Sequence, residues 1–270
     1  MSPSRKKRCV GGIGEPNSSE QTMFYKRLHE KLVQVVERNH LLDKEITIKT
    51  HILKPTEAIG EPERKDFPLL KGREVLMQAT FMESKGQAYT DAPSEFSGPL
   101  REIIDLGLED SRQKALFIAA LNAVMRYLYP DIRTVHCKNN EPEECAQEIK
   151  QYVQALKPDS VGVIGLQPAI LDAMVTLLGT DKVVCIDRDE DNRNQVKYGV
   201  PIGWGDDKGL EKVFEASDVV LATGSSSSNG SLAHILNMSE RYNTPVYFYG
   251  VTIAGAARLM GLNHLCFKST

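Results

Sequence analysis

The chain has 270 residues, of which 41% are hydrophobic and 26% are charged, a composition typical of a globular protein and unlike that of collagen-like or disordered chains. Its 33 lysines and arginines nearly balance its 36 aspartates and glutamates, so it lacks the protein-wide positive field that attracts nucleic acid. No apolar run approaches the roughly 20 residues that cross a bilayer, and no apolar signal segment follows the basic residues 5–8. We therefore expect a cytoplasmic protein with no membrane and no nucleic-acid partner.

The first half of the chain mixes helical and strand-like patterns. Residues 1–17 are basic and then glycine-rich, which predicts a flexible tail. Apolar residues then recur at helical spacing to about residue 42, and alternating patterns predict strands over 46–52 and 75–82. A short helix is expected to start near Ser97 and Pro99, and a long helix over 111–129 is apolar enough to be buried between layers. We expect residues 18–130 to form an α+β domain, followed by a bridge and helix over 131–157.

The second half alternates short Val/Ile-rich strands with helices. Strands are predicted over 160–165, 182–187, 218–223 and 245–250, and helices over 168–178, 208–215, 230–242 and 254–259. Because such strands with helical crossovers form parallel sheets, we predict a doubly wound, Rossmann-like domain over residues 158–270. The fold class is therefore α/β, with the α+β domain first and the parallel-sheet domain second.

Four loops at the carboxyl ends of these strands are candidate ligand sites, because ligands of open parallel sheets bind there. The loop over 223–231 is the most informative, since glycines, an asparagine and hydroxyls together can hold a carboxylate or phosphate. The alternative is a flexible Gly/Ser loop in which Asn229 or Ser228 only caps the next helix. Asp187 lies 22 positions after Gly165, near where dinucleotide-binding folds place the acid that binds ribose, although a solvated acidic loop is the alternative. The candidate ligand-binding residues are Asn122, Gly165, Asp187, Thr223, Gly224, Ser225, Asn229, Gly230, Gly250 and Thr252.

Metal ligands could come from two segments before the second domain. His136, Cys137 and Cys145 form the softest ligand set in the chain and suit a transition metal, whereas Asp91 and Glu95 are hard oxygen ligands or acid/base candidates. Each group also has an ordinary structural explanation, namely a buried inert thiol or the capping of a turn. The five cysteines do not resemble a secreted disulfide framework and are expected to be reduced.

Four segments of the chain resemble, in the same order, the bacterial and archaeal family of putative heavy-metal chelation proteins. They read AALNAVMRYLYP, VGVIGLQP, DVVLATGSSSSNGSL and VYFYGVTIAGAARLMGLNHLCF. The resemblance implies an enolase N-terminal-like domain paired with a Rossmann-like domain, with a metal or small ligand in the cleft between them. It also implies that the cleft is lined by Asn122, Gly165, Thr223, Gly224, Asn229, Gly230 and Gly250. The turn TIAGAA after Gly250 departs from the family, as do the basic tail and the segment from His136 to Cys145.

Three functional hypotheses follow from the sequence. The first is a protein that holds a small anionic molecule, or a metal ion or its complex, in the interdomain cleft. The second is an enzyme that uses a nucleotide or S-adenosylmethionine on the same loops, with Asp187 on the ribose. The third is binding of nucleic acid or a protein partner through residues 5–8. A two-domain chain of this size could also associate into homo-oligomers.

Overall fold

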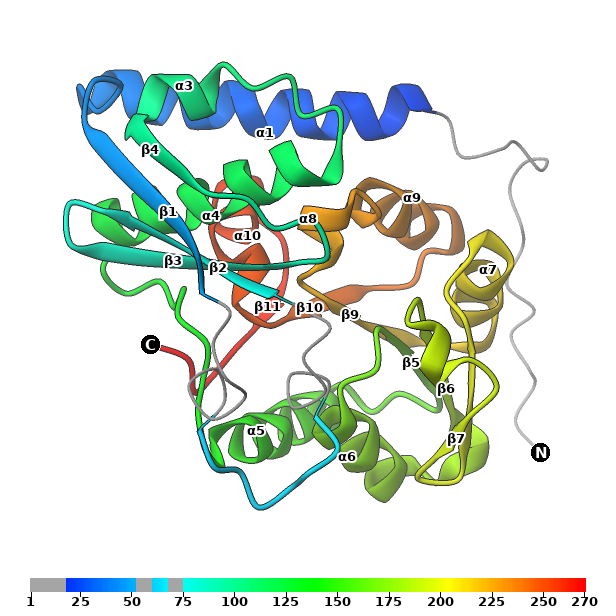
Figure 1. Ribbon diagram of the computed structural model, residues 1–270. Helices are drawn as coiled ribbons and strands as arrows, with labels where there is room; N and C mark the ends of the chain where they lie inside the picture. The colour runs from blue at the N-terminus through cyan, green and yellow to red at the C-terminus, as the bar shows by residue number, and fades with distance from the viewer. Residues whose placement is uncertain (1–17, 52–59, 68–74) are drawn as a thin grey trace.

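The computed structural model describes residues 18–51, 60–67 and 75–270, so the predicted tail over 1–17 lies outside the described residues. Two β-sheets lie side by side, with helices between and around them (Figure 1). This confirms the predicted α/β class, in which a mixed α+β part precedes a largely parallel sheet. Within the described residues, none of the helices has both the length and the apolar composition that a bilayer crossing needs.

The first sheet is antiparallel and has the strand order β3-β2-β1-β4. Its strands are β1 (Glu45–His51), β2 (Val75–Phe81), β3 (Ser84–Thr90) and β4 (Phe96–Pro99). The sequence pattern predicts β1 and β2 but neither β3 nor β4. The β2–β3 turn holds Met82 and Glu83 at φ of 46° and 70°, a conformation usually signalled by Asn-Gly, so the chain carries no recognisable hairpin motif.

Helix α4 (Ser111–Leu128) is the central element between the two sheets. Its residues from Ala115 to Met125 are all buried, as the continuous apolar pattern predicts. On one side it lies so close to β3 that a Cβ atom on Gly86 would stand 2.1 Å from the Ala123 nitrogen. Its other side packs against the second half of the chain at α8 (Ser226–Asn229) and α10 (Ala254–Met260).

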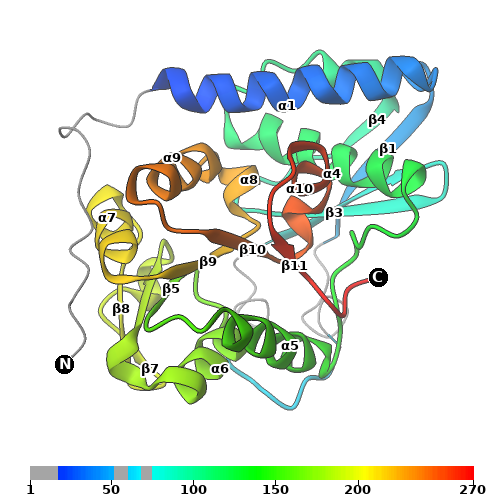
Figure 2. The same ribbon diagram turned by 180° about the vertical axis from the view of Figure 1, so that it is seen from behind.

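Two further helices complete the first half. Helix α1 (Ser18–Arg38) runs along the top of the molecule in Figures 1 and 2 and contacts α9 (Leu232–Tyr242) and α10. It ends before the predicted residue 42 because His40 takes a left-handed conformation with φ of 56°. Helix α3 (Leu100–Ile104) follows β4 and begins at Pro99, near its predicted start.

The second sheet has the order β11-β10-β9-β5-β6-β8-β7, and all its strands are parallel except the edge strand β7. The strands are β5 (Val161–Ile164), β6 (Val183–Asp187), β7 (Val196–Lys197), β8 (Val200–Trp204), β9 (Val219–Thr223), β10 (Val246–Tyr249) and β11 (His264–Leu265). Counted along the chain without β7, the parallel strands are arranged 3-2-1-4-5-6, the order of doubly wound dinucleotide-binding sheets. The sequence misses β7 and β8, because Pro201 and Gly203 interrupt the apolar pattern of β8.

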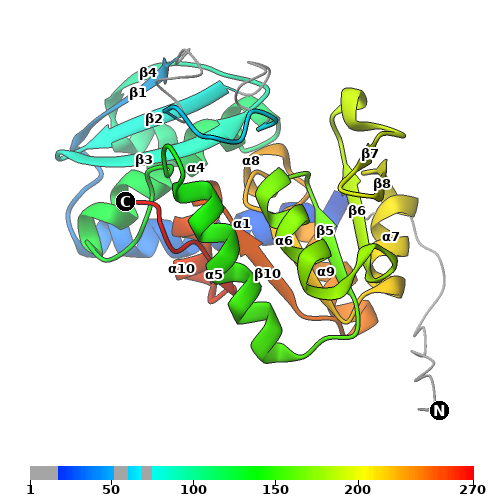
Figure 3. The same ribbon diagram turned by 90° about the horizontal axis from the view of Figure 1, so that it is seen from below.

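Helices cover both faces of the second sheet. Helices α5 (Glu141–Leu156) and α6 (Pro168–Leu178) cover one face, which is seen from below in Figure 3. Helices α7 (Asp207–Ala216) and α9 cover the other face, and their core continues into the core around α1, α4 and the first sheet. Short 3₁₀ helices, η2 (Thr180–Lys182), η3 (Glu190–Asn192) and η4 (Val251–Ile253), occupy three of the connections. The shared core places the end of β3 directly beside the carboxyl ends of β9 and β10.

Candidate ligand-binding cavity

A cavity of about 510 Å³ lies at the carboxyl ends of β5, β6, β9 and β10. The order of the strands reverses between β5 and β9, and doubly wound sheets bind ligands at this point. Residues of the first half close the other side. These are Phe67, Tyr89, Thr90, Asp91, Ser111, His136 and Pro142.

Eight predicted ligand residues are among those that line this cavity. They are Gly165, Asp187, Thr223, Gly224, Ser225, Asn229, Gly250 and Thr252, together with Asp91 and His136 from the predicted metal ligands. Gly165 ends β5 at φ of +86°, and a Cβ atom there would lie 2.7 Å from Cγ2 of Thr223. A side chain at position 165 would therefore both strain the backbone and close the gap between the β5 and β9 loops.

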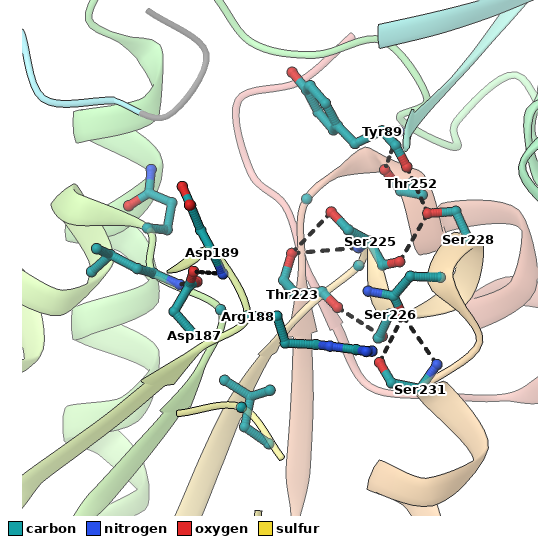
Figure 4. A pocket seen from close by; sticks show the side chains of 18 of the residues that line it. Tyr89, Asp187, Arg188, Asp189, Thr223, Ser225, Ser226, Ser228, Ser231 and Thr252 are labelled. Atoms are coloured by element: carbon teal, nitrogen blue, oxygen red, sulfur yellow. Dashed lines mark hydrogen bonds between the residues drawn. The ribbon is translucent and has the colours of Figure 1, made fainter. Parts of the chain in front are cut away.

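The Asp187 carboxylate holds two of the cavity loops together. Its Oδ2 accepts the Leu166 N–H at 2.5 Å, and its Oδ1 accepts the Asp189 N–H at 2.7 Å and the Asn192 amide at 3.2 Å. Asp187 and Asp189 are seen at the left of the cavity in Figure 4. The protein itself thus engages both oxygens of the acid that the sequence assigns to a ribose.

The loop after β9 is held by its own hydroxyls. The hydroxyls of Ser226 and Ser227 donate to the carbonyls of Thr223 and Gly224, both at 2.8 Å, and the Ser228 hydroxyl contacts the Tyr89 carbonyl at 2.6 Å. These bonds shape the short helix α8, so the segment is not the flexible loop of the alternative interpretation.

The end of this loop is held by the Asn229 side chain, which lines the cavity together with Ser231. Asn229 Oδ1 accepts from the backbone and hydroxyl of Ser231, at 3.0 and 2.8 Å. Gly230, at φ of +88°, makes the turn into α9 and does not line the cavity. Gly230 therefore affects the site only through the conformation that it gives to the loop.

Among the described residues that line the cavity, Arg188 is the only lysine or arginine, and it is not one of the candidates predicted from the sequence. It follows the last residue of β6, and its side chain extends toward Ser226 and Ser231 in Figure 4. No described residue forms an ion pair with it. In the sequence, Arg188 directly follows the aspartate that ends a predicted strand, which is a position typical of ligand-binding residues. The acidic residues after it obscure this signal.

His136 supplies a neutral imidazole at the first-half wall. Its ring meets the Tyr89 ring edge to face, with centroids 5.4 Å apart. Burial lowers the pKa of His136 to about 4, so the ring is uncharged at neutral pH. Nδ1 is buried and has no hydrogen-bond partner among the described residues. This nitrogen is the kind of group that a ligand could satisfy.

The predicted metal ligands do not assemble around the cavity. Cys137 and Cys145 do not line the cavity with His136, and Glu95 accepts from the Thr50 hydroxyl at 2.9 Å, away from Asp91 at the cavity. Within residues 18–51, 60–67 and 75–270, no three His, Cys, Asp or Glu side chains are arranged to hold a metal ion. These donor sets therefore do not fit a directly bound metal.

Asn122, a predicted ligand residue, also lies outside the cavity lining, although it connects the two halves of the chain. Its amide nitrogen donates to the carbonyls of Gln87, Val251 and Thr252 at 2.8, 3.2 and 2.9 Å. Its oxygen accepts the Gly255 N–H at 2.7 Å. The polar atoms of this fully buried side chain therefore form their hydrogen bonds within the protein.

Comparisons with known proteins agree with this fold. Residues 148–262 match the model of a family described as putative heavy-metal chelation. A protein with unknown function from the DUF364 family of Pyrococcus horikoshii is similar in structure, with a TM-score of 0.52, 15% identity, and coverage of 85% of this chain and 80% of that one. A second such protein, from Desulfitobacterium hafniense, has a TM-score of 0.51 and 11% identity, with 92% and 85% of the two chains covered. No curated protein matches the chain. The predicted resemblance is thus confirmed over residues 148–262, which match the model of the family described as putative heavy-metal chelation.

Proposed function

We propose that the protein binds a small molecule with a phosphate or carboxylate group in the cavity between the two sheets. The observation that carries the proposal is Arg188, a cation without an ion pair to any described residue, beside the hydroxyls at the carboxyl ends of the strands. A guanidinium binds such anions through paired, charge-assisted hydrogen bonds. The Ser225 hydroxyl, which accepts from the Thr223 hydroxyl at 3.3 Å and keeps its own proton for a ligand, would add a further donor.

Three aspartates also line the cavity, and their contacts explain why they leave a place for an anion. Asp187 is neutralised in part by three N–H donors. Asp189 caps the 3₁₀ helix η3 by accepting the Asp191 N–H at 3.0 Å. Asp91 is exposed and comes from the loop after β3, whereas Arg188 comes from the connection after β6. The anionic group therefore belongs beside Arg188, with the rest of the ligand extending toward His136.

The family's description adds a heavy metal to this account. Since the described residues offer no set of three metal ligands, the chain's residues support a metal only as part of a complex whose anionic component Arg188 holds. We therefore propose that the anion, with or without a bound metal, occupies the cavity.

A nucleotide or S-adenosylmethionine is the second candidate, and the strand order favours it. The order 3-2-1-4-5-6 places Asp187 at the end of the second strand, where dinucleotide-binding sheets hold the ribose. Against it, both oxygens of Asp187 already accept hydrogen bonds from the protein. This candidate makes adenosine, which carries no anionic group, the discriminating ligand.

The test is a thermal-shift series with phosphate, pyrophosphate, citrate, AMP, S-adenosylmethionine and adenosine. A ligand that binds only the folded chain raises its Tm. We expect at least one anion to raise the Tm of the wild type, and the shift to disappear in Arg188→Gln. Arg193→Gln is the matched control, because Arg193 lies on the same connection but stacks on the Trp204 ring, 4.9 Å from its centroid, and does not line the cavity.

Two results would overturn the proposal. One is an anion-induced shift that is equal in Arg188→Gln and the wild type. The other is the absence of a shift with every anion in the series. A shift with adenosine that survives Arg188→Gln would favour the nucleoside candidate instead.

A further inference from the structure

Three cysteines lie together near the C-terminus, outside the cavity. Cys137 precedes α5, Cys145 lies in its first half, and Cys266 directly follows β11. The Cys145 sulfur lies 3.4 Å from the backbone nitrogen of Phe267, the residue directly after Cys266, so Cys145 and Cys266 are neighbours. Cys137 is close enough to interact electrostatically with both. Far apart in the sequence, these sulfurs meet because the C-terminal segment passes beside α5 (Figure 3).

The surroundings of Cys145 favour its thiolate. The neighbouring Cys266 thiol and the backbone N–H groups of Phe267 and Lys268 favour a negative charge on its sulfur, and the Phe267 N–H donates to it at 3.4 Å. These donors lower the pKa of Cys145 to about 7, although burial opposes them. The neighbouring thiols differ, because burial raises the pKa of Cys137 to about 12 and the thiolate of Cys145 raises that of Cys266. One attacking thiolate thus lies beside one protonated partner.

The C-terminal segment holds this arrangement in place. The Thr270 N–H donates to the Val135 carbonyl at 3.0 Å, and the Thr270 carbonyl accepts from Thr134 and Val135 at 3.1 and 2.7 Å. The Cys266 sulfur also lies 2.8 Å from the Ser269 hydroxyl. Lys268 pairs with Glu148 of α5 at 2.8 Å. These hydrogen bonds and the ion pair therefore hold the C-terminal segment, which carries Cys266, against α5, which carries Cys145.

We propose that Cys145 and Cys266 form a redox pair that a hydroperoxide converts reversibly into a disulfide. The Cys145 thiolate attacks the terminal oxygen of the hydroperoxide, which breaks the O–O bond and gives a sulfenic acid at Cys145 and an alcohol or water. The Cys266 thiol then displaces the hydroxyl, forming the S–S bond and releasing water. Each disulfide takes two electrons from the sulfurs, and a small dithiol restores the pair.

The disulfide would fasten the C-terminal segment covalently to α5. It would close the long loop between positions 145 and 266, and such a constraint on the unfolded chain raises the stability of the folded one. We therefore expect the oxidised protein to have a higher Tm than the reduced protein. This inference is independent of the ligand in the cavity.

The experiment uses the full chain, freed of reductant and treated with hydrogen peroxide, then alkylated with N-ethylmaleimide and digested without reduction. Mass spectrometry should find a peptide in which Cys145 and Cys266 are linked, with the loss of two hydrogens, and the link should vanish after dithiothreitol. Cys185 should be alkylated only after denaturation, because it is buried in β6. A product in which Cys145 stays a free thiol, or is linked to Cys137 instead, would overturn the proposal.

Two variants test which sulfur attacks. Cys266→Ser should accumulate a sulfenic acid at Cys145 that dimedone captures, whereas Cys145→Ser should leave Cys266 unoxidised on the same timescale. Cys185→Ser is the matched control and should form the disulfide as the wild type does. Dimedone capture at Cys266 in Cys145→Ser at the rate seen for Cys145 would contradict the assigned roles. The peptide map of the wild type does not depend on how any variant folds.

Discussion

The junction around Asn122 and the cavity around Arg188 are both polar regions between the same two sheets, yet they use their polar groups in opposite ways. At the junction, Asn122 makes four hydrogen bonds and is completely buried. At the cavity, Arg188 has no ion pair with a described residue, and His136 Nδ1 has no hydrogen-bond partner there. A polar group whose hydrogen bonds are all made within the protein holds the two halves together, whereas a polar group without such partners can hold a ligand.

The largest expected effect breaks the junction. Asn122→Ala would leave three carbonyls and the Gly255 N–H without this partner, and each unsatisfied buried group costs about 1–3 kcal/mol. We expect urea unfolding to show a loss of roughly 3 kcal/mol or more. Asn39→Ala is the control, because Asn39 is exposed at the end of α1 and should cost about 0.5 kcal/mol or less. Equal losses in the two variants would contradict the role given to Asn122.

The next largest effect is a loss of folding stability at acid pH that depends on His136. Its pKa falls from 6.5 to about 4 in the folded state, so between these values the unfolded chain binds a proton that the folded chain does not. This contribution to stability is complete above pH 6.5 and is lost as the pH falls to 4, by up to about 3 kcal/mol. His136→Phe keeps an aromatic ring beside Tyr89 and removes the titration. Its unfolding free energy should fall less than that of the wild type between pH 7 and pH 4, and parallel curves would refute this.

Arg188→Gln should separate binding from stability. Loss of a charge-assisted hydrogen bond costs about 1.5–3 kcal/mol, which is a weakening of anion binding of roughly tenfold or more. The unfolding free energy should stay within about 0.5 kcal/mol of the wild type, because the exposed side chain forms no ion pair with a described residue. Calorimetric titration and urea unfolding of the same preparation measure the two effects. An affinity unchanged by the substitution would remove Arg188 from the site.

The smallest expected effect is a gain in anion affinity. Asp91→Asn removes an exposed negative charge from the cavity lining, so anion binding should become about two- to fivefold tighter at low salt. Glu95→Gln is the matched control, because Glu95 contacts Thr50 and does not line the cavity. Weaker anion binding by Asp91→Asn would show that Asp91 contacts the ligand.

The periodic elements were predictable from the sequence, whereas the use of each polar group was not. The alternating and helical patterns predict α4, α6, β5, β6, β9 and β10 almost to the residue. They miss β3, because its turn at Met82 and Glu83 carries no glycine or asparagine.

The same limit applies to the candidate site. The loops after the strands were found because parallel strands bring their carboxyl ends together, and ten predicted residues do line the cavity. Asn122, Gly230, Glu95, Cys137 and Cys145 do not, since no sequence pattern tells whether a polar group is already satisfied within the protein. Arg188 was missed because an isolated arginine among acidic residues forms no motif.

The most direct test of the central claim is native mass spectrometry, paired with elemental analysis, on wild type, Arg188→Gln and Arg193→Gln purified without a metal-affinity column. The account predicts a bound small anion, or its uptake from added pyrophosphate, in the wild type and Arg193→Gln but not in Arg188→Gln. A stoichiometric transition metal that all three proteins retain without any anionic component would contradict it, and would place the function in direct metal binding.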